Sequence, residues 1–261
     1  MAAEDTRPVA LVTGAQRGIG RATAVTLAKA GFDVAVNDLK HENALDETTR
    51  LVEAEGASAA PIAGDVADLD GHEALLDAVT GRFGRHDCLV NNAGVSVFNR
   101  GDLLEVSRES YDHCLDINTR GTFFLTQAFA RRLVDTSPPE PGIHRSIITV
   151  TSANAEAASI NRGEYCVSKA GLSMMVKLFA LRLAEAGVGV YEIRPGVIET
   201  DMTAPAKEDY SERIKKGLTP IRRWGQPEDI ARTVATMAQG LLPFTVGEAV
   251  HVDGGLHVPR L

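Results

Sequence analysis

Tyr165, Lys169 and Ser152 are the residues whose types and spacing most directly suggest chemistry. On a helix, residues four apart lie on one face, so the Tyr165 phenol and the Lys169 ammonium would point into the same space. An ammonium about 4 Å from a phenolate stabilises it by roughly 4 kcal/mol at an effective dielectric constant of about 20. Such a pair could bring the pKa of a tyrosine from about 10 toward neutrality, where the phenol can exchange a proton with an alcohol oxygen. Because Tyr-x-x-x-Lys also occurs by chance on helix surfaces, this interpretation needs support from other motifs.

A glycine-rich turn lies near the N-terminus. The apolar run Val9–Val12 is followed by Thr-Gly-Ala-Gln-Arg-Gly-Ile-Gly at 13–20 and by a helical pattern at 22–28. Strand, glycine turn and helix start are the context in which a glycine motif is credible. Glycines let the backbone approach a pyrophosphate, whose charge is met by the N–H groups at the helix end. The spacing is G-x-x-x-G-x-G, which differs from the G-x-G-x-x-G of the long dehydrogenases.

Two asparagine-containing segments add to the pattern. Asn-Asn-Ala-Gly at 91–94 ends the apolar strand that begins at Cys88, and Asn118 precedes an apolar helix at 123–129. Taken alone, the first is an ordinary strand-to-loop turn and the second a structural hydrogen-bonding residue. Their order along the chain, between the glycine turn and Tyr165, gives them weight.

Together these motifs resemble the short-chain dehydrogenase/reductase family in its compact form, and the resemblance covers residues 9–256. Arg194-Pro195-Gly196 and the Val-Asp-Gly-Gly ending at 252–255 also appear in family order. The resemblance implies an NAD(P)-dependent oxidoreductase that interconverts a secondary alcohol and a ketone by hydride transfer. It also implies an α/β Rossmann fold, doubly wound around a seven-stranded parallel sheet of strand order 3-2-1-4-5-6-7, with helices on both faces.

The resemblance assigns four catalytic residues. Tyr165 is expected to be the general acid in reduction and the general base in oxidation, and Lys169 to lower its pKa and bond the nicotinamide ribose. Ser152 is expected to stabilise charge on the substrate oxygen. Asn118 is expected to hold a water that links Lys169 to solvent.

The resemblance also assigns the cofactor-binding residues. The pyrophosphate is expected along the glycine turn, the adenine beside the end of the third strand, and the nicotinamide carboxamide beside the loop after the sixth strand. Tyr165 and Lys169 contribute as well. The other expected cofactor-binding residues are Thr13, Gly14, Arg17, Gly18, Ile19, Gly20, Asp38, Asp65, Val66, Asn92, Ala93, Gly94, Pro195, Gly196, Ile198 and Thr200.

Asp38, at the end of the second predicted strand, decides the expected cofactor. Its carboxylate can accept hydrogen bonds from ribose hydroxyls and would repel a 2′-phosphate, which favours NAD. Arg17 favours NADP, because family members that use NADP often carry a basic residue at this place, and Lys40 could act in the same direction. We expect NAD, with NADP as the alternative.

Composition bounds the remaining classes. The 261 residues suit one domain, residues 1–261, and the net charge of −8 argues against nucleic acid or an anionic membrane as a partner. No N-terminal apolar stretch or membrane-length run is present, and the cysteines and histidines show neither a disulfide pattern nor metal-ligand spacing. We therefore expect a cytoplasmic protein that uses no metal.

The elements that must position these residues follow an alternating pattern. Short apolar runs without polar alternation suit a parallel sheet covered on both faces. The predicted strands are Val9–Val12, 32–37, Ala59–Ala63, Cys88–Asn91, 146–151, 188–193 and Ala249–Val252. The proline-rich segment 135–142 predicts a stiff surface loop. Residues 201–226, hereafter the lid, are expected to cover the substrate, as in the family.

Two predicted helices, at 121–133 and 168–183, are apolar on more than one face. A helix that covers a sheet needs one apolar stripe, so the excess must be buried elsewhere. In the family these helices pack against partner subunits, which implies a homotetramer, with a dimer as the alternative.

Polar residues near Ser152 and Tyr165 suggest the substrate. Asn154, Glu156, Asn161 and Glu164 would border a pocket too polar for a steroid or long acyl chain, which favours a sugar, polyol or similar alcohol. Facing solvent or capping a helix is an equal alternative for some of them. A second hypothesis is an NADPH-dependent 3-oxoacyl-(acyl-carrier-protein) reductase, with Arg131 and Arg132 meeting an acidic carrier protein. A regulatory protein without catalysis is the third, although all four catalytic residues are present.

Overall fold

The computed structural model describes residues 7–136 and 139–260. Its seven strands form one parallel sheet in the order β3-β2-β1-β4-β5-β6-β7, which confirms the predicted topology. The strands are β1 (Val9–Val12), β2 (Asp33–Asp38), β3 (Ala59–Ala63), β4 (Cys88–Asn91), β5 (Arg145–Val150), β6 (Val188–Pro195) and β7 (Ala249–Val252). The helices are α1 (Gly18–Lys29), α2 (Asn43–Ala54), α3 (His72–Phe83), α4 (Arg108–Cys114), α5 (Thr122–Asp135), α6 (Gly163–Leu183), α7 (Lys207–Lys215) and α8 (Pro227–Ala238).

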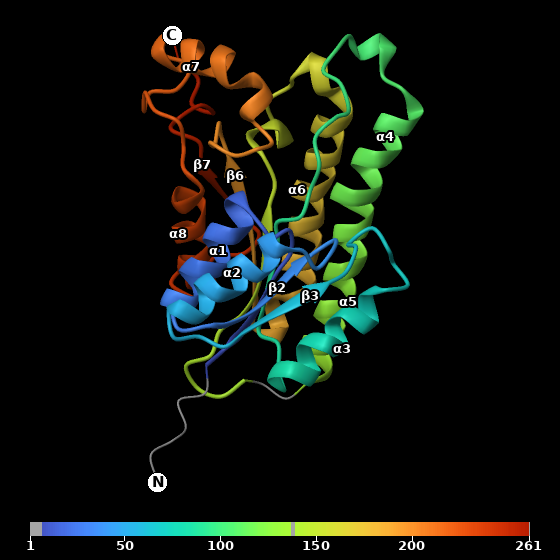
Figure 1. Cartoon of the computed structure of the whole chain (residues 1–261), viewed down its shortest axis with the longest axis vertical. Helices are drawn as coiled ribbons and strands as arrows, with labels where there is room; N and C mark the ends of the chain where they lie inside the picture. The colour runs from blue at the N-terminus through green and yellow to red at the C-terminus, as the bar shows by residue number, and fades with distance from the viewer. Residues whose placement is uncertain (1–6, 137–138, 261) are drawn as a thin grey trace.

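Helices cover both faces of the sheet, as Figure 1 shows with α1, α2 and α8 on one side and α3, α5 and α6 on the other. Strand β1 shows why its sequence has no polar alternation. Ala10 and Val12 pack into the core under α1 and α8, while Val9 and Leu11 pack into the core under α3 and α5. Because successive side chains point to opposite faces and both faces are dry, every position must be apolar.

The carboxyl ends of parallel strands open on one edge of the sheet, and the predicted chemistry-bearing segments follow them. The glycine turn follows β1, Asn92 follows β4, Ser152 follows β5 and Gly196 follows β6. Figure 1 places α7, which belongs to the lid, at the same end of the molecule.

Several element boundaries differ from those predicted. Helix α6 begins at Gly163, five residues before the predicted start at 168, so that Tyr165 lies in its first turn. A π-helical turn, Leu115–Gly121, precedes α5 and contains Asn118. Residues 137–138 of the predicted loop at 135–142 lie outside the described residues, and Asp135 is the last residue of α5.

Within the described residues, no helix is long and apolar enough to span a bilayer. In the same part of the chain, no three His, Cys, Asp or Glu side chains gather into a group that could hold a metal ion.

Candidate active site

A cavity of about 920 Å³ lies at the carboxyl edge of the sheet. This volume is at the upper end of the range for ligand pockets. The glycine turn and the end of β2 line one end, Tyr165 and Ser152 line the other, and residues of the predicted lid line one side. Of the residues assigned to the cofactor, all except Thr13 line this cavity.

Tyr165 and Lys169 share one face of α6 and are both buried, with relative exposures of 8% and 5%. The Lys169 Nζ lies 5.6 Å from the centroid of the Tyr165 ring and donates a hydrogen bond to the carbonyl of Val150 at 3.3 Å. Ser152 follows β5, and its hydroxyl accepts a hydrogen bond from the backbone N–H of Asn154. The structure therefore brings the three residues of the first motif together at one wall of the cavity.

Burial dominates the ionisation of this pair. It raises the pKa of Tyr165, and a hydrogen bond from Ser152 and the positive charge of Arg162 oppose the rise. It also lowers the pKa of Lys169 to about 8, against the negative charge of Glu192. The sequence predicted a tyrosine pKa lowered by Lys169. The structure gives the opposite direction, and the nearby cation that favours the phenolate most is Arg162.

Asn118 holds two segments together beneath the cavity. Its Oδ1 accepts from the backbone N–H of Val95 at 2.8 Å, and its Nδ2 donates to the Val95 carbonyl and to the Ser168 hydroxyl, each at 3.0 Å. The side chain is fully buried. These bonds hold the loop that follows β4 against α6. Asn118 therefore positions the helix that carries Lys169. Its expected role in holding a water stays a prediction.

The glycine turn has the shape that a dinucleotide requires. Gly14 and Gly18 have positive φ angles of 63° and 54°, which other residues rarely adopt. A Cβ at Gly20 would lie 2.1 Å from the Gly14 carbonyl oxygen, so no larger residue fits where α1 begins. The Asn92 side chain donates to the carbonyls of Thr13 and Gly14, and this fixes the turn from behind. The first N–H groups of α1 thus face the cavity, where they can bind a pyrophosphate.

Asp38 ends β2 at the rim of the same cavity. Its carboxylate accepts hydrogen bonds from the backbone N–H groups of Gln16 and Leu39 at 3.2 and 2.9 Å. Arg17 forms an exposed ion pair with Asp201 of the lid at 3.1 Å. The residues present therefore fit a nicotinamide dinucleotide, and the Asp38 carboxylate lies where the sequence predicts contact with the adenosine ribose.

The structure places one of the four expected substrate residues in the lining of the cavity and three outside it. Asn154 lines the cavity. Glu156 and Asn161 do not line the cavity. Glu156 pairs with Arg194 and His251, and Asn161 accepts a hydrogen bond from Ser159. Glu164 is 3% exposed and accepts a hydrogen bond from the Ser110 hydroxyl at 2.7 Å. Glu164 precedes Tyr165 in α6, and adjacent residues of a helix lie on different faces. Its side chain therefore packs against α4.

Sequence reasoning missed the side chains that do line the substrate end. Arg100, Ser159, Arg162 and Arg213 lie there with Tyr210 of the lid. For Arg162 a signal was present, because a residue three positions before Tyr165 at a helix start lies near its side chain. No comparable signal marks Arg100 or Arg213, which reach the cavity only through loop and lid geometry.

The chain matches the family model described as enoyl-(acyl carrier protein) reductase over residues 14–257. It is 34% identical over 251 residues to a 3-oxoacyl-(acyl-carrier-protein) reductase of Staphylococcus aureus, covering 95% of this chain and 98% of the relative. It is 30% identical over 253 residues to glucose 1-dehydrogenase 2 of Bacillus subtilis, covering 96% and 95%. A 3-oxoacyl-(acyl-carrier-protein) reductase from Brucella melitensis, solved in complex with NAD, superposes with a TM-score of 0.94 at 44% identity and covers 98% of this chain and 99% of that one.

The charge of Arg162 gives a prediction for the ionisation of Tyr165. A guanidinium stabilises the phenolate, so its removal in Arg162→Gln should raise the pKa of Tyr165 and shift tyrosinate formation to higher pH. Ultraviolet difference titration, with Tyr165→Phe subtracted to isolate this residue among the four tyrosines, measures the midpoint. Arg50→Gln, on the exposed face of α2, is the control and should leave it in place. An unchanged midpoint in Arg162→Gln would show that this charge does not act on the phenol.

Proposed function

Because the chain belongs to the short-chain dehydrogenase/reductase family and is an NAD(P)-dependent oxidoreductase of alcohols and ketones, we propose that its substrate is a polar, sugar- or polyol-like secondary alcohol. The observation that carries the proposal is the cavity. Its wall holds Ser152, Tyr165 and Lys169 beside a glycine turn that fits a dinucleotide. Asn154, Ser159, Arg100 and Arg162 also line the cavity, and polar groups of this kind suit a substrate with several hydroxyl groups.

We assign the proton chemistry to Tyr165. In oxidation its phenolate takes the proton of the substrate hydroxyl, and in reduction its phenol donates a proton to the carbonyl oxygen. Ser152 donates a hydrogen bond to the same oxygen and stabilises the charge that develops there. Lys169 holds the nicotinamide ribose. The bound cofactor supplies the hydride acceptor or donor.

An NADPH-dependent 3-oxoacyl-(acyl-carrier-protein) reductase is the second candidate. The similar Staphylococcus aureus and Brucella melitensis proteins are named 3-oxoacyl-(acyl-carrier-protein) reductases, and glucose 1-dehydrogenase 2 supports the sugar alternative. The expectation that Arg131 and Arg132 bind a carrier protein is weakened by the ion pairs that Arg132 forms within the chain. Arg132 binds Asp77 at 2.8 Å and Glu73, so its charge is already neutralised within the chain, and Arg131 alone remains exposed.

Steady-state assays distinguish these two candidates. We expect the purified protein to oxidise members of a panel of sugars and polyols with NAD, and Tyr165→Phe to lower kcat by about 100-fold or more. Tyr111→Phe, an exposed tyrosine on α4, is the control and should keep full activity. An unchanged rate in Tyr165→Phe would remove its acid–base role. Turnover of an acetoacetyl thioester alone would favour the reductase.

We propose NAD as the preferred cofactor. The Asp38 carboxylate at the rim would lie against a 2′-phosphate, whereas Arg17 is paired with Asp201 and is mostly exposed. An unneutralised carboxylate facing a phosphate costs more free energy than an exposed arginine regains.

Parallel fluorescence titrations with NADH and NADPH test this preference. We expect tighter NADH binding, and in Asp38→Asn a shift of about tenfold or more toward NADPH because the repulsion is removed. Asp46→Asn, on the exposed part of α2, should keep the original preference. If the unchanged protein binds NADPH more tightly, Arg17 and Lys40 override Asp38, and the 3-oxoacyl reductase becomes the better candidate.

We further propose a homotetramer, with a dimer as the alternative. Support comes from α5 and α6, which leave large apolar side chains exposed on their outer faces: Phe124, Val167, Met174, Leu178 and Leu181. An apolar patch of this extent on paired helices is typical of a subunit interface. The single-domain organisation, the lid at 201–226 and the cytoplasmic location also stay predictions. Met202, Tyr210 and Leu218 of the lid line the cavity, which supports a cover.

Sedimentation of the purified protein measures the assembly. We expect a tetramer, and a smaller species for the double variant Leu178→Glu, Leu181→Glu, because charges on this face oppose its burial. Leu104→Glu, an exposed leucine outside these helices, is the control. A monomer for the unchanged protein would overturn the proposal.

A further inference from the structure

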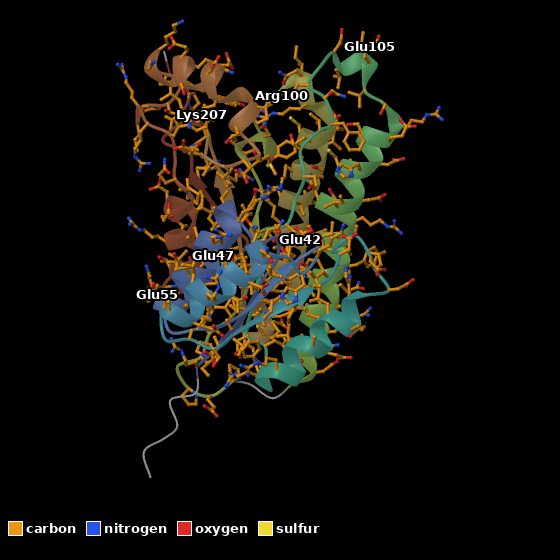
Figure 2. The ribbon with its side chains drawn as sticks, viewed as in Figure 1. Glu42, Glu47, Glu55, Arg100, Glu105 and Lys207 are labelled. Carbon is orange, nitrogen blue, oxygen red and sulfur yellow. The ribbon has the colours of Figure 1, made fainter. Side chains whose placement is uncertain are left out.

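Three guanidinium groups surround one tyrosine at the substrate end of the cavity. The Cζ atoms of Arg100 and Arg213 lie 5.7 and 5.6 Å from the centroid of the Tyr210 ring. Arg162 donates a hydrogen bond to the Tyr210 hydroxyl at 3.3 Å, and its Cζ lies 5.4 Å from the centroid of the Tyr165 ring. All three arginines line the cavity. Figure 2 labels Arg100 between the segment that contains Lys207 and the segment that contains Glu105.

These cations have few acidic partners. Within residues 7–136 and 139–260, neither Arg100 nor Arg162 forms an ion pair, and Arg213 has an exposed one with Asp209 at 3.5 Å. The acidic residues of the lining belong elsewhere. Asp38 ends β2, Glu42 follows β2, Asp65 follows β3, and Asp201 pairs with Arg17, so none of the carboxylates that line the cavity lies at the substrate end.

This arrangement concentrates positive charge that a bound anion can neutralise. The protein as a whole has a net charge of −8, yet three cations gather around one ring and repel each other. Cation–π contacts with Tyr210 return only about 0.5–1 kcal/mol each at exposed sites. Arg162 is half-buried beside Tyr165, where loss of hydration adds to the penalty. An anion bound among the three groups would remove both costs.

We propose that the substrate is a hydroxy acid or its oxo form, with a carboxylate held by Arg162 together with Arg100 and Arg213. The alcohol carbon lies at Ser152 and Tyr165. This inference rests on the proposed function and narrows it from polar alcohols to anionic ones. A guanidinium can bind a carboxylate through two parallel hydrogen bonds, which fixes the substrate as well as attracting it.

The position of Arg162 limits the size of the acid. Its guanidinium lies beside the ring of the proposed acid–base residue, so the carboxylate and the reacting carbon must lie within a few bonds of each other. A small polyhydroxy acid satisfies this condition. In a carrier-bound thioester the phosphate lies at the far end of a long arm, so the same arginines would not reach it while the carbonyl contacts Tyr165.

Matched substrates test the charge directly. Oxidation of a six-carbon aldonate with NAD is compared with that of the alditol of the same configuration, which differs in the carboxylate. We expect kcat/KM for the aldonate to be higher by about tenfold or more, as charge-assisted hydrogen bonds produce. The excess should shrink at high ionic strength, because salt screens the partly exposed arginines. Equal values for the two substrates would overturn the inference and leave the polar-alcohol function intact.

Variants locate the effect. Arg100→Gln and Arg213→Gln should each raise KM for the aldonate several-fold, with a smaller effect on kcat, and the double variant should lose the preference over the alditol. Arg162→Lys keeps a positive charge without the planar fork and should retain part of the preference that Arg162→Gln loses. Arg50→Gln is the control for a surface arginine and should keep the preference in full. A preference that survives in the double variant and in Arg162→Gln would contradict the assignment.

A binding measurement separates this inference from the proposed function. Trp224 is the chain's one tryptophan, and its ring lies 6.0 Å from that of Tyr210, so its fluorescence should report occupation of the subsite. The protein with bound NAD is titrated with the aldonate and with the alditol. Aldonate binding that is weakened in Arg100→Gln, without turnover, would show the anion subsite to be real and the proposed oxidation to be wrong. Absence of a difference between the two ligands would overturn the subsite whatever the enzyme oxidises.

Discussion

Burial of the Lys169 ammonium is the constraint on which the rest of the site depends. Taking a cation out of water costs several kcal/mol, and here it lowers the pKa of Lys169 to about 8. The structure compensates through the Val150 carbonyl and, over a longer distance, the charge of Glu192. An ammonium has three N–H donors. Because Lys169 also lines the cavity, donors beyond the one bound by Val150 are available to a ligand hydroxyl. The buried Lys169 ammonium therefore keeps N–H donors that can bind a ligand in the cavity.

Glu192 is itself fully buried and fully bonded. Its two oxygens accept hydrogen bonds from Thr151, Ser173 and Arg194, and Arg194 continues outward to Glu156. Removing one partner of such a buried ion pair typically costs about 3–5 kcal/mol, since the other charge is left unpaired. The network joins the ends of β5 and β6 to α6. It therefore fixes Ser152 and the loop at Gly196 relative to Tyr165, and it takes Glu156 away from the substrate.

The sequence was sufficient where one local pattern determines the outcome. Dry strands such as β1 require apolar residues throughout, and the i,i+4 spacing of Tyr165 and Lys169 places them on one face. It failed where the outcome depends on partners distant in the chain. Glu164 turned toward Ser110, 54 positions away, and burial, which no spacing reveals, reversed the expected direction of the Tyr165 pKa. Arg100 and Arg213 come from a loop and the lid, so only the folded chain brings them to Arg162.

The lid joins the two ends of the cavity through contacts that are individually weak. Asp201 binds Arg17 beside the glycine turn, and Arg162 donates a hydrogen bond to Tyr210 beside Tyr165, the proposed acid–base residue. The first is an exposed ion pair, which contributes at most about 1 kcal/mol, and the second is a long hydrogen bond. Tyr210 and Ile214 of the lid are also buried, so these two polar contacts are only part of what holds the lid in place. An anionic ligand between Arg162 and Arg213 would contact the lid through Arg213 and the rest of the protein through Arg162. We therefore expect substrate charge to favour the closed position of the lid, and the closed lid to help exclude water.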